Sequence, residues 1–141
     1  MAEESALSGD EQLRIGREQY EAATDFTVAI EEEFAILDPD TLSLTNRFEE
    51  LKASAVGTEL EPHIVGELIA SEVEVRTGRC ETFADAAALV PTRRAQLREL
   101  ADDLGVELGA TGTHPWSPWQ DQRIIDTPHY RLRDELLRYV V

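Results

Sequence analysis

The segment from Val28 to Leu37 reads VAIEEEFAIL and decides the fold class of this chain. Apolar side chains recur at every second residue, from Phe26 onward, which is typical of a β-strand with two different faces. One face is expected to carry the larger apolar residues Phe26, Val28, Ile30, Phe34 and Ile36. The other face is expected to carry Glu31 and Glu33, with Glu32 on the opposite side.

Glu31 and Glu33 form the first candidate site. Two residues apart on a strand, their side chains point the same way at a separation of roughly 6–7 Å. Like charges beside apolar neighbours are unfavourable unless a positive group neutralises them. Magnesium does so well, because it prefers oxygen ligands and is often shared between carboxylates and substrate phosphates. Acidic runs are also common on solvated surfaces, so the residues alone leave a cation site and an exposed strand face both open.

A second alternating segment, IASEVEVRT from Ile69 to Thr77, predicts another strand. Its charged face carries Glu72, Glu74 and Arg76. Glu74 is therefore a candidate third carboxylate for the same site. Glu67 and Glu72 are competitors for that role, and each of these glutamates is also compatible with a solvated or ion-paired position.

Two helices are expected between and after these strands. Phe48 to Val56 has a helical pattern. The clearest helix runs from Phe83 to Leu104, with Thr82 as a capping residue and Gly105 as its stop. Pro91 predicts a kink in this helix or a break into two helices.

The remaining segments complete a single α+β domain. Residues 1–24 are expected to form an acidic N-terminal extension, frayed or briefly helical and outside the core. Val106 to Thr111 predicts a short buried strand that leads into the turn GTHP. A last helix is expected from Pro128 to Val141, and because it is apolar and lacks a stop signal we expect the chain to be the front part of something longer.

Composition restricts the partners. The chain has 141 residues with 13 basic and 29 acidic side chains, a net charge of −16, which opposes binding to nucleic acid or to anionic membranes. No apolar stretch is long enough to span a membrane, and the N-terminus lacks the pattern of a signal peptide. Cys80 is the single cysteine. A cytoplasmic location is therefore expected, and the oligomeric state is left open.

The turn at Gly112 to Pro115 is a further candidate site. Its backbone N–H groups, the Thr113 hydroxyl and the His114 ring could bind a phosphate or carboxylate, and His114 could bind a metal. The turn is equally compatible with a tight loop against which Trp116 and Trp119 pack. Arg76 and Arg131 are candidates for holding a substrate carboxylate, or ordinary surface arginines. The chain has no sequence typical of a phosphate-binding loop, a dinucleotide fold or a zinc site.

A series of segments in one order resembles the glutamate–cysteine ligase type 2 family of ATP-dependent carboxylate–amine ligases. The segments are VAIEEEFAILDPDT, SEVEVRTG, ELADDLGVEL, GATGTHPW and HYRLRDEL. The resemblance covers about residues 25–141, which would be the N-terminal part of the catalytic domain. It implies a glutamine synthetase-like fold, in which helices pack on one face of a curved antiparallel sheet and ATP and Mg²⁺ bind on the concave side.

The resemblance also implies a reaction and a set of site residues. The γ-carboxylate of glutamate is phosphorylated by ATP, and an amine, typically that of cysteine, attacks the acyl phosphate. Carried over to this sequence, the expected magnesium ligands are Glu31, Glu33 and Glu74. The expected substrate-binding residues are Thr77, Thr113, His114 and Arg131. No catalytic residue is assigned, and no residue selects the acceptor amine.

The chain departs from the family in two respects. His129 stands where the family usually has arginine, which puts a substrate contact in doubt. Family members are more than twice this long, and a histidine-rich strand with a further metal ligand is expected just after Val141. We therefore expect the 141-residue chain alone to be inactive. The alternatives are a non-catalytic homologue that binds a nucleotide, a metal or a partner chain, and a plain α+β domain with surface glutamates.

Overall fold

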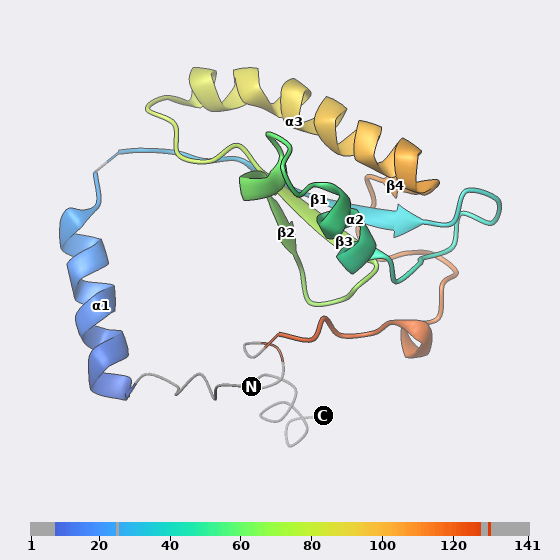
Figure 1. Cartoon of the computed structure of the whole chain (residues 1–141), viewed down its shortest axis with the longest axis horizontal. Coiled ribbons are helices and arrows are strands. Elements are labelled where there is room, and N and C mark those ends of the chain that lie inside the picture. The colour runs from blue at the N-terminus through green and yellow to red at the C-terminus, as the bar shows by residue number, and fades with distance from the viewer. Residues whose placement is uncertain (1–7, 25, 128–129, 131–141) are drawn as a thin grey trace.

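A four-stranded antiparallel sheet lies at the centre of the computed structural model, which describes residues 8–24, 26–127 and 130 (Figure 1). Its strands are β1 (Glu31–Leu37), β2 (Ile64–Gly66), β3 (Glu72–Arg76) and β4 (Glu107–Gly109). They are arranged in the order β2-β3-β1-β4, so the two strands expected from alternating sequence occupy the middle of the sheet. The α+β class and the antiparallel sheet are confirmed.

The pairing of β1 with β3 gives the sheet two chemically different faces. Phe34 lies opposite Val73, and Glu33 lies opposite Glu74. Ile36 and Val73 are fully buried, because their face of the sheet meets the helices. Since side chains alternate along each strand, the paired glutamates lie on the other face.

Three α-helices accompany the sheet in the described part of the chain: α1 (Gly9–Ala22), α2 (Phe48–Ser54) and α3 (Phe83–Leu104). Two short 3₁₀ turns, η1 (Glu61–His63) and η2 (Trp119–Asp121), lie in the connecting segments. Figure 1 shows α3 running across one side of the sheet, whereas α1 lies apart from it and buries no residue. None of the described helices is long and apolar enough to cross a membrane.

The bounds of α3 agree with the sequence prediction. The Thr82 hydroxyl accepts a hydrogen bond of 3.1 Å from the backbone N–H of Asp85, and Gly105 ends the helix with a φ of 73°. Of the two alternatives for Pro91, the break into two helices is wrong, because the helix is continuous through it, and the kink stays a prediction. Proline removes one backbone N–H there, but Ala86 before it and Leu97 after it are both anchored in the core.

The core joins α2 and α3 to one face of the sheet. Phe48 and Leu51 of α2 and Leu97 of α3 belong to the same buried cluster as Ile36 and Val75 of the sheet. Burial of such apolar side chains is the main favourable term in folding. The opposite face of β1 and β3 is free to carry polar groups, and the candidate site lies there.

The structure also places several shorter segments. Asp38 closes the turn after β1, because its side chain accepts hydrogen bonds from the backbone N–H groups of Asp40 and Thr41. The segment after this turn forms a single antiparallel bridge, from Leu44 to Leu37. The expected last helix, Pro128 to Val141, lies outside the described residues except for Tyr130.

Candidate metal centre

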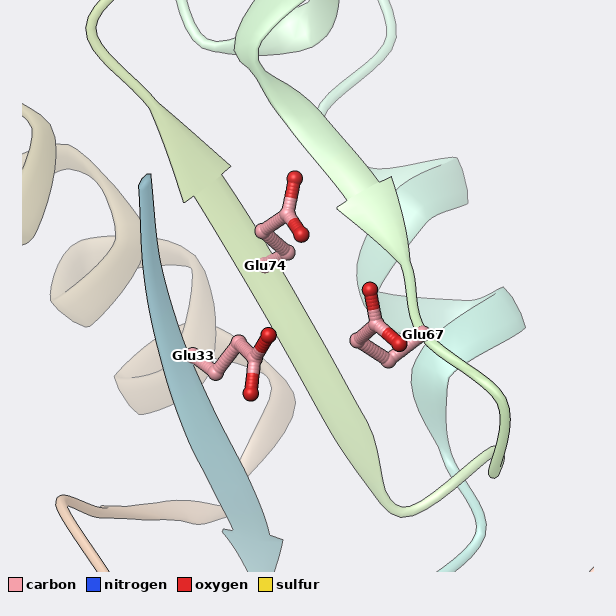
Figure 2. Close-up of side chains that lie close together, drawn as sticks. All are labelled: Glu33, Glu67 and Glu74. Carbon is pink, nitrogen blue, oxygen red and sulfur yellow. The ribbon is translucent and has the colours of Figure 1, made fainter. Parts of the chain in front are cut away.

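Three glutamates from three segments converge on the polar face of the sheet. Glu33 on β1 is the direct cross-strand partner of Glu74 on β3, and Glu67 follows the last residue of β2. Each residue contributes one carboxylate oxygen to a group of three oxygens that all lie within 4.8 Å of one another. Figure 2 shows the three side chains on the same side of the sheet, each reaching from a different stretch of chain. We call Glu33, Glu67 and Glu74 the carboxylate cluster.

The surroundings of this cluster are unfavourable for so much negative charge. Glu74 is only 4% exposed and Glu67 is partly buried, whereas Glu33 is exposed. Burial raises the pKa of Glu67, and hydrogen bonding to Glu74 and the charge of Glu33 raise it further. Burial also raises the pKa of the neighbouring Glu72, with the charges of Glu33 and Glu67 adding to the shift. The site therefore favours a positively charged ligand.

One positive side chain already lies at the edge of the cluster. The Nε of Arg76 donates to the carboxylate of Glu74, and it lies 3.1 Å from Oε1 of Glu31. The pKa of Arg76 is raised, first by its hydrogen bond to Glu74 and then by the charges of Glu74 and Glu31. Arg76 thus neutralises part of the negative charge at the end of the cluster where Glu31 lies.

The sequence prediction for the metal ligands was Glu31, Glu33 and Glu74. The structure brings Glu33 and Glu74 together, but the third member of the close group is Glu67. Glu31 is paired with Arg76, its direct cross-strand partner. The metal-binding role of all four glutamates stays a prediction.

The donor set of the carboxylate cluster fits a hard divalent cation. All three ligand groups are carboxylates, and Mg²⁺ and Mn²⁺ are bound in proteins mainly through oxygen atoms of this kind. Glu74, which is buried within the sheet, has the least freedom to turn away. Three carboxylate ligands leave coordination positions on such a cation for water or for the oxygen atoms of a substrate phosphate.

A pocket of about 280 Å³ adjoins the cluster on the same face. Ala35 and Glu72, which form the cross-strand pair next to Glu33 and Glu74, make up its floor. Its walls come from the segments after β1 and β4, and they include Leu44, Thr113, His114, Ser117, Trp119 and Gln122. The pocket therefore combines one carboxylate, hydroxyl groups and an exposed indole beside the cluster.

His114 connects the segment after β1 with the segment after β4 through hydrogen bonds. Its Nε2 lies 2.9 Å from the backbone oxygen of Leu42, and its Nδ1 accepts a hydrogen bond of 3.1 Å from the N–H of Ser117. This network assigns the hydrogen to Nε2, because a carbonyl oxygen can only accept. The ring also packs edge-on against Trp116, with 4.7 Å between centroids. Thr113 and His114 both line the pocket, and their substrate-binding role stays a prediction.

The other two predicted substrate residues are placed differently. Thr77 is buried, and its hydroxyl accepts a 3.0 Å hydrogen bond from the N–H of Ile30 and lies 3.0 Å from the carbonyl oxygen of Gly78. These bonds tie the end of β3 to the residue before β1. Arg131 lies outside the described residues.

Glu32 confirms the division between the two faces. It forms an ion pair with Arg94 of α3, including a hydrogen bond of 2.8 Å from Nε, on the helix side of the sheet. The central glutamate of the EEE run is therefore separated from the carboxylate cluster by the sheet itself. Alternation along the sequence was sufficient to predict this arrangement.

Comparison with known proteins gives a consistent result. The protein-family model described as Glutamate-cysteine ligase family 2 (GCS2) matches residues 27–140 of this chain. A protein of Rubrobacter xylanophilus is 40% identical over 117 residues, which is 83% of this chain and 32% of that protein. One of Mycobacterium tuberculosis is 35% identical over 106 residues, which is 74% of this chain and 27% of that protein. The first is named "Putative glutamate--cysteine ligase 2-3" and the second "Putative glutamate--cysteine ligase 2". The chain spans about a third of the length of these relatives.

Proposed function

Since the chain belongs to the glutamate–cysteine ligase family 2, we propose that it supplies the cation-binding part of an ATP-dependent ligation. The proposed reaction joins the γ-carboxylate of glutamate to an amine, typically that of cysteine, through an acyl phosphate. The observation that carries the proposal is the carboxylate cluster of Glu33, Glu67 and Glu74 beside a pocket lined by Thr113 and His114. A cytoplasmic location and a glutamine synthetase-like catalytic fold are part of the same proposal.

In this proposal, the residues of the chain bind and orient more than they react. Glu33, Glu67 and Glu74 hold Mg²⁺, which when bound neutralises the charge of the ATP phosphates. Glu74 fixes the position of the ligand set because it is buried in the middle of the sheet. Such positioning and charge neutralisation are the main requirements of phosphoryl transfer, which needs little covalent chemistry from the protein.

The adjoining pocket is the proposed place for a small substrate. Its volume of about 280 Å³ suits an amino acid, and its lining residues Ala35 and Glu72 form the cross-strand pair next to Glu33 and Glu74. Thr113 supplies a hydroxyl for hydrogen bonding, whereas His114 maintains the shape of the pocket through its bonds to Leu42 and Ser117. Glu72 lies on the boundary between the pocket and the cluster and attracts the ammonium group of an amino acid.

Cation binding tests the proposed site directly. Calorimetric titration of the purified chain with Mn²⁺ or Mg²⁺, with and without ATP, is expected to show binding that Glu74→Gln weakens at least tenfold. Glu81→Gln is the matched control, because Glu81 is exposed and pairs with Arg79 at 3.8 Å, away from the cluster. Equal affinities in the wild type and both variants would contradict the proposed site.

A second candidate is a homologue that binds a cation or nucleotide without catalysis. It is supported by one observation: all three carboxylates of the proposed cation site belong to this chain. Incubation with Mg·ATP, glutamate and cysteine separates the two functions. Equal amounts of ADP and γ-glutamylcysteine would establish ligation by this chain, whereas cation and nucleotide binding without either product would support the second candidate.

A further inference from the structure

Arg76 lies at the edge of the candidate site and contacts one of the carboxylates that would bind a cation. It is the last residue of β3 and the cross-strand partner of Glu31, and its side chain lies on the polar face of the sheet. Its Nε donates to Glu74, the most buried carboxylate of the cluster, and also contacts Glu31 at 3.1 Å. An arginine side chain is charged at any pH at which a protein is folded.

The guanidinium and a divalent cation have the same electrostatic function at Glu74. Each neutralises a carboxylate that is only 4% exposed and stands beside Glu33 and Glu67. Arg76 contacts Oε1 of Glu74, so a cation bound to that carboxylate would share it with the guanidinium. Even without a direct clash, a fixed positive charge a few ångströms away repels a divalent cation.

Arg76 is also able to move away. Its side chain is 43% exposed, and it reaches the cluster from the end of a strand and not from the packed core. Glu31 offers it a second carboxylate that is itself 54% exposed and lies outside the close group of three oxygens. A shift of the guanidinium from Glu74 to Glu31 would keep one ion pair and expose the carboxylate of Glu74.

We propose that Arg76 is an internal counter-ion that balances Glu74 in the cation-free protein and lowers the affinity of the carboxylate cluster for divalent cations. The inference rests on the proposed cation site. Arg76 then has two opposing effects. It stabilises the folded protein when no cation is bound, and it must leave Glu74 before a cation can use that carboxylate fully.

Cation affinity of charge variants tests this inference. Arg76→Gln is expected to bind Mn²⁺ or Mg²⁺ roughly three- to tenfold more tightly than the wild type, since one repelling charge is removed at a partly exposed position. Arg76→Lys keeps the charge and is expected to stay near the wild-type affinity. Arg79→Gln makes the same change in net charge outside the cluster and is expected to change the affinity by less than twofold.

A second readout does not depend on the affinity measurement. In EDTA, Arg76→Gln is expected to unfold at a lower temperature than the wild type, because Glu74 has lost its partner. The same excess of Mg²⁺ is expected to raise its Tm by more than it raises the Tm of the wild type, since the stabilisation by a bound ligand grows with the logarithm of its concentration divided by its Kd. Should Arg76→Gln fail to fold, Arg76→Met removes the same charge while keeping the aliphatic stem.

The outcomes separate this inference from the proposed function. Unchanged or weaker cation binding by the charge-free variants, with normal binding by the wild type, would overturn the role of Arg76 and leave the cation site intact. An increase of equal size in Arg79→Gln would also overturn it, because net charge alone would explain the effect. Absence of binding in the wild type and in the charge-free variants would overturn both the cation site and the inference.

Discussion

Glu33 and Glu74 are direct cross-strand partners, so their carboxylates share the face of the sheet that the helices leave open. Two charged carboxylates in this position repel each other unless a positive charge neutralises them. The third carboxylate, Glu67, makes the arrangement less stable without a cation and better suited to hold one.

The first prediction distinguishes Glu67 from Glu31 as the third ligand. Glu67→Gln is expected to weaken Mn²⁺ binding at least tenfold, because its oxygen lies within 4.8 Å of those of Glu33 and Glu74. Glu31→Gln is expected to weaken it by no more than about threefold, since Glu31 pairs with Arg76 at the edge. Titration of both variants by electron paramagnetic resonance measures the difference. A larger loss in Glu31→Gln would favour the ligand set expected from the sequence alone.

The second prediction concerns the wall of the pocket. His114→Ala removes the hydrogen bonds to Leu42 and Ser117, and it is expected to destabilise this loop by about 1–2 kcal/mol. Amide exchange at Ser117 should accelerate, and the fluorescence of the tryptophans should change because Trp116 loses its ring contact. Gln120→Ala, at an exposed position nearby, is the control. Unchanged exchange at Ser117 would show that His114 does not support the loop.

The third prediction concerns the close approach between β2 and α2. A Cβ at Gly66 would lie 2.5 Å from Cε1 of Phe48 and 2.6 Å from Cδ1 of Ile125, both in the core. Gly66→Ala is therefore expected to lower the free energy of unfolding by roughly 1–3 kcal/mol in urea titrations. Gly112→Ala, where the added Cβ would meet nothing within 4 Å, is expected to change it by less than about 0.5 kcal/mol. Similar values for the two variants would refute the close packing.

The fourth prediction concerns pH. Arg123 donates two hydrogen bonds of 2.9 and 2.8 Å to Glu49, and this pairing holds the pKa of Glu49 below its ordinary value of 4.5. A carboxylate with a lowered pKa in the folded state contributes stability above pH 4.5 and loses it as the pH falls through the folded-state pKa.

The difference in unfolding free energy between the wild type and Glu49→Gln should therefore shrink as the pH is lowered from about 6 to about 3. Urea titrations across this range measure it. Glu21→Gln, on the exposed helix α1, provides the comparison for a carboxylate outside the fold. A difference that stays constant over the whole range would mean that the pair with Arg123 does not contribute to stability.

Local patterns were sufficient to predict the middle of the sheet and the helix that covers it. The alternation in β1 and β3 assigned Glu33 and Glu74 to one face and Glu32 to the other, because a strand has a period of two residues. Thr82 predicted the start of α3, because a threonine side chain can accept a hydrogen bond from a free backbone N–H group in the first turn of a helix. Of the kink or break expected at Pro91, the break is wrong, because buried residues on both sides of the proline belong to one continuous helix.

The composition of the site depended on contacts between distant segments, which one sequence does not specify. Glu67 follows β2, a strand of three residues whose short pattern does not define a register. Its place beside Glu74 follows only from the pairing of β2 with β3. In the same way, the partnership of Glu31 with Arg76 follows from the register between β1 and β3. A charged residue at the end of a strand gives no indication of its partner across the sheet.

Strand β1 contributes to the core with one face and to the candidate site with the other, and this restricts how the protein can change in evolution. The even-numbered residues of Glu31–Leu37 face the helices and the odd-numbered ones face the site, so a single-residue insertion or deletion within the strand would exchange the two sets. A carboxylate would then enter the core while Phe34 or Ile36 would face the cluster. Substitutions can alter either face separately, but changes in length are expected to be tolerated only outside the strand, as in the turn at residues 38–41.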